Sequence, residues 1–451
     1  MSGIAELLAN LGYVVSGSDE KRSAVTDRLS TLGIEVAYGH TAANVGRADV
    51  VVTSSAVRPT NVEVCEAVRR HIPTIPRAEM LAELMRLRYA VAVAGSHGKT
   101  TTSSMVAFVL ERAGLDPTAV IGGRVSAFGS NARLGRGEWM VAEADESDRS
   151  FLKLYPTIAV MTNIDHEHLE NYGSFGELQQ AFVDFANKVP FYGAVVACLD
   201  DAPLAEVLPR LTRRISTYGL VAPGADLMAT DIRMELMGST ATVRRRVADP
   251  DGGPGALEVL GPLSLNVPGR HNLQNALAAV AVASELGVPY GAIAAALGEF
   301  RGAERRFEVR GEVNGILVVD DYGHHPTEIA AVLAAAQALG RRIVVAFQPH
   351  RFSRTAALMD AFGPAFAGAD HVVLTDIYAA GEEPMSGITV DALAAAVRRG
   401  TRATVDVVPR LDQVVPALVR VARRGDLVIT LGAGSIGSLP DPLLAALGGP
   451  S

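Results

Sequence analysis

The chain has 451 residues, of which 49% are hydrophobic and 20% charged; this composition excludes a disordered or fibrous protein and, at this length, predicts about three domains. Its 41 basic residues are outnumbered by 49 acidic ones, so nucleic acid is not expected as a partner. Cys65 and Cys198 form no disulfide framework, no apolar run is long enough to cross a membrane, and the first residues lack a signal-peptide pattern, so we expect a soluble, cytoplasmic protein with no membrane partner.

The first part of the chain, residues 1–89, alternates short apolar runs with helical patterns, which predicts a small α/β domain. The pattern begins inside what looks like the first helix of a nucleotide-binding βαβ unit, so we expect this domain to lack its first strand and glycine loop. The expected elements are helices over residues 4–11 and 23–32 and strands over residues 13–16, 35–37 and 50–53.

A second domain is expected over residues 90–301. Its strand candidates are residues 90–94, 139–142, 158–162 and 194–198, and a hairpin around the Gly/Pro-rich residues 252–255 precedes a helix over residues 272–286.

The third domain, residues 302–451, repeats strand and helix at regular spacing, which predicts a doubly wound parallel sheet. The expected strands are residues 316–319, 343–347, 372–375, 404–408 and 427–431.

The strongest local motif is the glycine-rich loop after the strand at residues 90–94, which runs directly into a helix. Backbone N–H groups of such a loop bind phosphates; Lys99 would reach the β- and γ-phosphates, and the Thr100 hydroxyl would bind Mg²⁺. The motif departs from the full GxxxxGK[ST] pattern because Val93 stands where the first glycine is expected, and a plain glycine-rich turn is the alternative. The residues that we expect to bind ATP here are Gly95, Ser96, His97, Gly98, Lys99, Thr100 and Thr101.

Acidic and histidine side chains follow the next two predicted strands. Glu143 comes first after the strand at residues 139–142 and is the best candidate metal ligand, with a solvated acidic loop as the alternative. His168 follows the strand at residues 158–162 in an acid-rich segment and is the second candidate; His166 is less favoured, and a purely structural histidine is the alternative. Lys99, Glu143 and His168 form the predicted catalytic set.

Two further polar loops follow strands of the third domain. Either could be ordinary strand-to-helix capping, but the two together favour a ligand with anionic groups, bound bidentately by Arg351 and Arg354. The candidate residues in these loops are His324, His325, His350, Arg351 and Arg354.

With these motifs in order along essentially the whole chain, the sequence resembles the Mur ligases of bacterial cell-wall synthesis. The matching segments are residues 12–19, 54–57, 95–101, 143–148, 163–168, 268–272, 305–307, 320–328, 348–355 and 378–382.

The resemblance implies a Rossmann-like first domain for a UDP-sugar, a central P-loop ATPase domain with a mainly parallel sheet, and a Rossmann-like third domain that completes the ATP and amino-acid site. It also implies that His271 and Asn272 line the nucleotide site, and that Lys99, Thr100, Glu143 and His168 have the roles given above. The implied substrate-binding residues in addition to the third-domain loops are Ser18, Asp19, Ser54, Ser55 and Arg306.

The implied reaction is ATP-dependent. The lactyl carboxylate of UDP-N-acetylmuramate is phosphorylated to an acyl phosphate, which the amine of L-alanine attacks to give the amide, ADP and phosphate, with Mg²⁺ as cofactor. The expected oligomeric state is a monomer or a weak homodimer.

Three other functions compete with this interpretation. A recycling ligase would join a preformed tripeptide instead of alanine, a folylpolyglutamate synthase would share only the ATPase core, and a non-catalytic relative would bind UDP-sugar or ATP without turnover. The recognisable first domain argues against the second, and the complete set of Lys99, Thr100, Glu143 and His168 argues against the third.

The sequence departs from the family pattern in two further ways. Ser96 stands where many members have threonine, and no lysine aligns with the carbamylated lysine of some relatives.

Overall fold

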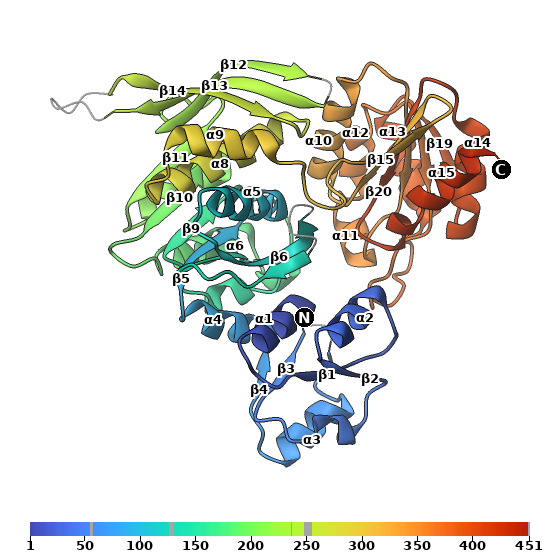
Figure 1. Ribbon diagram of the computed structural model, residues 1–451. Helices are drawn as coiled ribbons and strands as arrows, with labels where there is room; N and C mark the ends of the chain where they lie inside the picture. The colour runs from blue at the N-terminus through green and yellow to red at the C-terminus, as the bar shows by residue number, and fades with distance from the viewer. Residues whose placement is uncertain (55–56, 126–129, 236, 248–254, 450–451) are drawn as a thin grey trace. The chain divides into compact units, whose positions relative to one another are not determined.

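The computed structural model describes residues 1–54, 57–125, 130–235, 237–247 and 255–449 (Figure 1). Parallel strands alternate with helices through most of the chain, which confirms the predicted α/β class. No helix among the described residues is long and apolar enough to span a membrane.

Internal contacts divide the chain into two compact units rather than three. The boundaries 1–89, 90–301 and 302–451 therefore remain predictions. The first unit comprises Met1–Asp231, Ala241–Leu263 and Gln274–Phe300, and the second comprises Ile232–Thr240, Ser264–Leu273 and Arg301–Ser451.

The first 89 residues form two separate parallel two-stranded sheets, β1–β2 and β3–β4. The elements are α1 (Ser2–Asn10), β1 (Ser16–Asp19), α2 (Ala24–Thr31), β2 (Glu35–Tyr38), β3 (Val51–Thr53), α3 (Val62–Arg69), β4 (Thr74–Pro76) and α4 (Arg77–Met85).

The prediction of a strand over residues 13–16 was wrong, because β1 begins only at Ser16. The apolar residues Tyr13 and Val14 are exposed. The N–H of Tyr13 donates to the carbonyl of Leu8, so this segment closes the end of α1, with Gly12 at φ +91° making the turn. The apolar residues that suggested a strand therefore belong to the segment that ends α1.

A ten-stranded sheet forms the centre of the first unit, in the order β14-β13-β12-β11-β10-β9-β5-β8-β6-β7. Its strands are β5 (Tyr89–Ala94), β6 (Thr118–Val125), β7 (Ser130–Arg133), β8 (Trp139–Glu143), β9 (Ile158–Met161), β10 (Ala194–Cys198), β11 (Ile215–Gly219), β12 (Leu227–Glu235), β13 (Gly238–Arg246) and β14 (Leu257–Leu265). The accompanying helices are α5 (Lys99–Arg112), α6 (Phe175–Ala186), α7 (Ala202–Val207), α8 (Arg270–Glu285) and α9 (Tyr290–Glu299).

Three strands of this sheet place the predicted site. β5 pairs in parallel with β8 on one side and β9 on the other, so their carboxyl ends meet at one edge. All three consist largely of side chains that are almost completely buried, because both faces of the parallel sheet are covered. The four strands predicted for this domain are confirmed; the strands β6, β7, β11 and β12 were not predicted. The expected hairpin turn at residues 252–255 falls largely outside the described residues.

The second unit contains a six-stranded sheet in the order β15-β16-β20-β17-β18-β19, parallel except for the edge strand β15. All five predicted strands are confirmed, and only β15 was missed. The strands are β15 (Glu308–Val313), β16 (Ile316–Asp321), β17 (Ile343–Phe347), β18 (His371–Leu374), β19 (Thr404–Val407) and β20 (Leu427–Leu431).

Helices cover both faces of this sheet. Alternate residues of β16 show the two sides: Val319 belongs to one hydrophobic core and Val318 to the other. Because β20 lies between β16 and β17, the strand order reverses there, and ligands of open α/β sheets bind at such a point. The helices are α10 (Pro326–Gln337), α11 (Phe352–Ala357), α12 (Phe362–Ala365), α13 (Val390–Gly400), α14 (Val414–Val421) and α15 (Pro440–Gly448).

Candidate active site

The glycine-rich loop joins β5 to α5, as predicted. Gly95 has φ +141°, and a Cβ there would lie 1.9 Å from Oγ1 of Thr162. Gly98, at φ +82°, precedes α5, and a Cβ there would lie 2.8 Å from Oδ1 of Asn275. Both positions therefore require glycine. Thr100 and Thr101 lie in the first turn of α5 and are almost fully buried.

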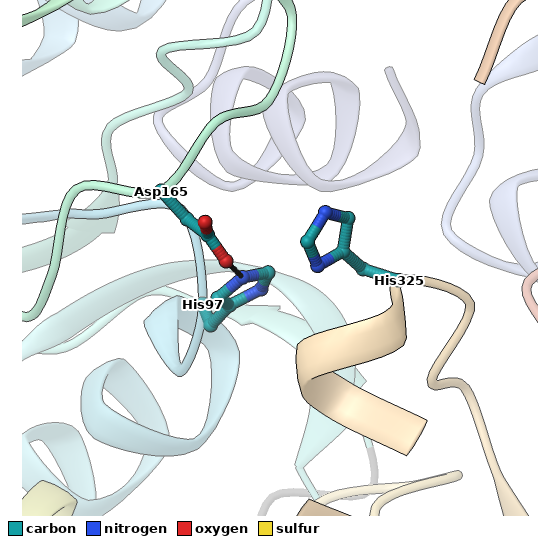
Figure 2. A group of neighbouring side chains, drawn as sticks. All are labelled: His97, Asp165 and His325. Carbon is teal, nitrogen blue, oxygen red and sulfur yellow. Dashed lines mark hydrogen bonds and ion pairs between the residues drawn. The ribbon is translucent and has the colours of Figure 1, made fainter. Parts of the chain in front are cut away.

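The segment after β9 holds this loop in place through its backbone and side chains. The N–H of His97 donates to Oδ1 of Asn163 at 2.8 Å, and Oγ1 of Thr162 donates to the His97 carbonyl at 2.6 Å. The N–H of Asp165 donates to Oγ of Ser96 at 2.8 Å, and Oδ2 of Asp165 lies 2.8 Å from Nε2 of His97 (Figure 2). Thr162, Asn163 and Asp165 were not among the predicted site residues, although Thr162 ends the predicted strand 158–162 and the other two belong to the acid-rich segment that contains His168.

Lys99 points back over the loop. Its ammonium donates to the carbonyl of Gly95 at 2.6 Å and to that of Ser96 at 3.2 Å, and it binds both carboxylate oxygens of Glu146 at 2.9 and 2.8 Å. Burial opposes the charge on Lys99, but the nearby carboxylates, with Glu146 the strongest, outweigh it and raise the lysine pKa. Burial also raises the pKa of Glu146, to about 7.

Glu143 is the last residue of β8 and is paired with Val93 of β5, so it lies beside the strand that leads into the phosphate loop. Its Oε1 accepts a hydrogen bond from the N–H of Gly122 at 2.8 Å. Its role as a metal ligand stays a prediction.

His168 lies in a compact group of potential ligands. One ligand atom from each of Glu146, Glu167 and His168 falls within 4.8 Å of the others, and the two glutamates are buried. His168 has φ +57°, a conformation that is uncommon outside glycine. The neighbouring His166 instead stacks on Phe175, with ring centroids 3.9 Å apart, which suits the structural alternative. The burial of Glu146 and Glu167 could not be predicted from the sequence, because both stand in segments rich in charged residues.

His271 and Asn272 lie at the start of α8; this first part of the helix, up to Leu273, belongs to the second unit, and the rest of α8 belongs to the first. Burial and then the positive charge of Arg306 lower the pKa of His271 to about 4. Asn272 is buried, and its side-chain N–H donates to the carbonyl of Pro268 at 2.7 Å. Arg306 also lies near Tyr322, with its guanidinium carbon 5.2 Å from the ring centroid.

Of the residues predicted in the first 89, Ser18 and Asp19 end β1, whereas Ser54 follows β3 in the other two-stranded sheet. Oγ of Ser18 donates to Oε2 of Glu63 at 2.6 Å and lies 3.1 Å from Nδ1 of His40. Oδ1 of Asp19 accepts from the N–H of Lys21 at 3.2 Å. The Ser54 carbonyl accepts from the N–H of Val57, and Ser55 lies outside the described residues.

The two polar loops of the second unit come together as predicted. The rings of His324 and His350 have centroids 5.5 Å apart, and His350 stacks on Tyr378 at 5.5 Å. Burial lowers the pKa of His324 to about 3 and that of His350 to about 4, so both rings are neutral at pH 7. Nη1 of Arg354 lies 3.2 Å from Nδ1 of His350. Tyr378 opens the family-matching segment 378–382 but was not among the predicted site residues; its aromatic ring is part of this cluster.

Arg351 and His325 mark the beginnings of two helices. Arg351 has φ +73° and precedes α11, where Glu382 accepts from both the N–H and the hydroxyl of Ser353. His325, also labelled in Figure 2, caps α10 by accepting from the N–H of Thr327 at 3.3 Å. The capping alternative therefore describes His325 well, while its role toward substrate stays a prediction.

Comparisons with known proteins agree with this architecture. Family models match residues 1–89 (Mur ligase family, catalytic domain), residues 93–283 (Mur ligase middle domain) and residues 305–434 (Mur ligase, glutamate ligase domain).

Curated relatives match over nearly the full length. UDP-N-acetylmuramate--L-alanine ligase of Geotalea daltonii is 55% identical over 437 residues, which cover 97% of this chain and 93% of the relative. The ligase of the same name from Geobacter sulfurreducens is 54% identical over 450 residues, covering 99% and 95%.

Solved structures give the same picture. The UDP-N-acetylmuramate-alanine ligase MurC of Thermotoga maritima superposes with a TM-score of 0.81 at 28% identity, covering 99% of this chain and 96% of that one. A murein peptide ligase of Psychrobacter arcticus gives 0.72 at 25% identity, covering 100% and 97%. The chain belongs to the Mur ligase family.

Proposed function

We propose that this protein joins L-alanine to the lactyl carboxylate of UDP-N-acetylmuramate with cleavage of ATP to ADP and phosphate, as a step of peptidoglycan synthesis. The observation that carries the proposal is the phosphate loop with Lys99 at the shared carboxyl edge of β5, β8 and β9, in a chain 53–55% identical to curated relatives named for this reaction. L-Alanine is favoured over a tripeptide because the alanine ligase structure superposes with the higher TM-score, 0.81 against 0.72.

The phosphate loop supplies what phosphoryl transfer needs most, which is fixed positive charge. Its N–H groups and the start of α5 bind the phosphates, and the ammonium of Lys99 neutralises charge on the transferred group. The bonds from Thr162, Asn163 and Asp165 hold the loop rigid, so little reorganisation is needed when charge develops.

The residues present also fit a divalent cation. Hydroxyl and carboxylate oxygens such as those of Thr100 and Glu143 are the donors that Mg²⁺ prefers, and Glu146, Glu167 and His168 bring ligand atoms within 4.8 Å of one another. We assign Thr100, Glu143 and His168 as the ligands. A bound Mg²⁺ would add positive charge at the phosphates.

We assign the amino-acid substrate to the second unit, with Arg351 and Arg354 as binders of its carboxylate. His324 and His350 are neutral at pH 7 and are weak bases, because their pKa values are about 3 and 4. They therefore act as hydrogen-bonding groups that orient the substrate rather than as groups that hold a proton through turnover.

We assign the UDP-sugar to the first 89 residues, around Ser18, Asp19 and the segment beginning at Ser54. Both cysteines of the chain are free thiols, which supports a reducing, cytoplasmic compartment. We expect a monomer or a weak homodimer.

An isotope-transfer experiment tests the acyl phosphate. UDP-N-acetylmuramate carrying ¹⁸O in its lactyl carboxylate is incubated with ATP and L-alanine, and the released phosphate is analysed by mass spectrometry. Carboxylate attack on the γ-phosphorus, followed by amine attack on the acyl carbon, leaves one ¹⁸O in the phosphate. Phosphate without label, released together with the amide product, would contradict the mechanism.

A further inference from the structure

Glu146 is a buried carboxylate that shares a group of possible ligands with Glu167 and His168 but is not one of the residues assigned above to the metal or to catalysis. Its side chain is 2% exposed, and both oxygens bind the ammonium of Lys99, at 2.9 and 2.8 Å. The backbone of Glu146 is also held in place. The hydroxyl of Tyr172, which is itself buried, donates a hydrogen bond to the Glu146 backbone carbonyl. The guanidinium carbon of Arg149 lies over the ring of Tyr172, 5.2 Å from the ring centroid.

The ammonium of Lys99 is fully engaged in this arrangement. A lysine has three N–H donors, and its partners here are the carbonyls of Gly95 and Ser96 and the carboxylate of Glu146. Glu146 is the one anion among these partners. A nucleotide phosphate offers the same chemistry, an anionic oxygen, and so competes directly with Glu146 for Lys99.

We propose that Glu146 is a positioning residue that holds Lys99 over the phosphate loop before the nucleotide binds and yields it to the β- and γ-phosphates of the nucleotide. This inference rests on the proposed function and concerns the same site. The carboxylate keeps the buried ammonium compensated while no phosphate is present, because a buried charge without a partner is strongly destabilising. In return, it lowers nucleotide affinity, because binding must weaken an existing ion pair.

The consequence can be measured on binding alone. Glu146→Gln keeps a hydrogen-bond acceptor of the same shape but removes the charge, so Lys99 is released more readily. We expect ADP to bind roughly three- to tenfold more tightly to this variant than to the wild type. AMP, which lacks the phosphates that Lys99 would reach, should bind unchanged.

The experiment is isothermal titration of the full-length chain with ADP and AMP in EDTA, so that metal coordination contributes nothing. Glu146→Asp keeps the charge and should restore an affinity close to that of the wild type. Glu79→Gln is the matched control, because Glu79 pairs with Lys153 at 3.1 Å in an exposed ion pair of the same type.

A double-mutant cycle with Lys99→Met separates the proposed role from a structural one. If Glu146 acts through Lys99, Glu146→Gln has no effect on ADP affinity when Lys99 is methionine. The inference is overturned if Glu146→Gln weakens ADP binding in a folded protein, tightens AMP equally, or acts in the Lys99→Met background. If wild-type protein binds no ADP at all, the proposed function fails rather than this inference.

Discussion

Asp165 and His97 join the two loops of the phosphate site by a hydrogen bond of 2.8 Å between Oδ2 and Nε2. His97 lies within the phosphate loop and Asp165 follows β9, 68 residues further along the chain. The bond therefore anchors the phosphate loop to the segment that follows β9. Both side chains are largely buried, with exposed fractions of 13% for His97 and 27% for Asp165.

Asp165→Ala should weaken ATP binding more than it slows the chemical step. Loss of a hydrogen bond with a charged partner costs about 1.5–3 kcal/mol, so we expect the KM for ATP to rise at least tenfold. Steady-state kinetics with varied ATP would show this. Asp406→Ala is a matched control, because Asp406 pairs with His371 at the same distance of 2.8 Å between β18 and β19; an equal rise in KM for both variants would contradict the assignment.

Lys99→Ala should abolish turnover. Without the ammonium, charge on the transferred phosphoryl group is not neutralised, and we expect kcat to fall by about a thousandfold or more. The measurement is ligation product per unit time at saturating substrates. Lys153→Ala, at the exposed pair with Glu79, should keep full activity. Ligation by Lys99→Ala at more than a few percent of the wild-type rate would refute the phosphate-loop assignment.

Gly95→Ala should destabilise the fold and remove nucleotide binding. The new Cβ would meet Oγ1 of Thr162 at 1.9 Å, on a backbone with φ +141°, which we expect to cost about 2–4 kcal/mol in the free energy of unfolding. Gly114, at the other end of α5, has φ +79° and open space around it, so Gly114→Ala should cost about 1 kcal/mol. Denaturant unfolding of both variants compares them, and equal losses would show that the clash is relieved without strain.

Stability should fall as the pH drops from about 6.5 to about 4. Burial lowers the pKa values of His271 and His350 to about 4 and that of His324 to about 3, below the value near 6.5 in an unfolded chain. Between these pH values the three histidines bind protons in the unfolded state but not in the folded state. Lower pH therefore favours unfolding, by on the order of 1–3 kcal/mol per histidine.

Thermal melts at pH 7.5 and pH 5 would measure this effect. His324→Asn should lose less stability between the two pH values than the wild type loses, because one histidine that the folded state leaves unprotonated has been removed. A pH difference as large in His324→Asn as in the wild type would show that His324 makes no such contribution.

The sequence predicted what is local. Gly95, Gly98 and Lys99 form a contiguous motif, and β5, β8 and β9 are runs of small and apolar side chains, so both could be identified without tertiary information. The two loops of the second unit were also found, because each directly follows a strand of the same parallel sheet.

What the sequence could not predict depends on contacts between distant residues. Glu146 looks like one of several acids in a solvated loop, and only its burial beside Lys99, 47 residues away, shows otherwise. Tyr378 becomes part of the histidine cluster through its pairing with the His350 backbone. The prediction of a strand at residues 13–16 was wrong for the opposite reason. The local apolar pattern predicted a strand, but these residues follow the turn that ends α1, where the N–H of Tyr13 donates to the carbonyl of Leu8.

The most direct test of the proposed ligase activity is phosphate release from ATP by this chain in the presence of UDP-N-acetylmuramate, with no acceptor, with L-alanine or with the tripeptide. We expect release that depends on L-alanine and is matched mole for mole by the alanyl product. Release with the tripeptide alone would instead assign the protein to peptide recycling, and release in none of the three arms would contradict the proposed ligase activity.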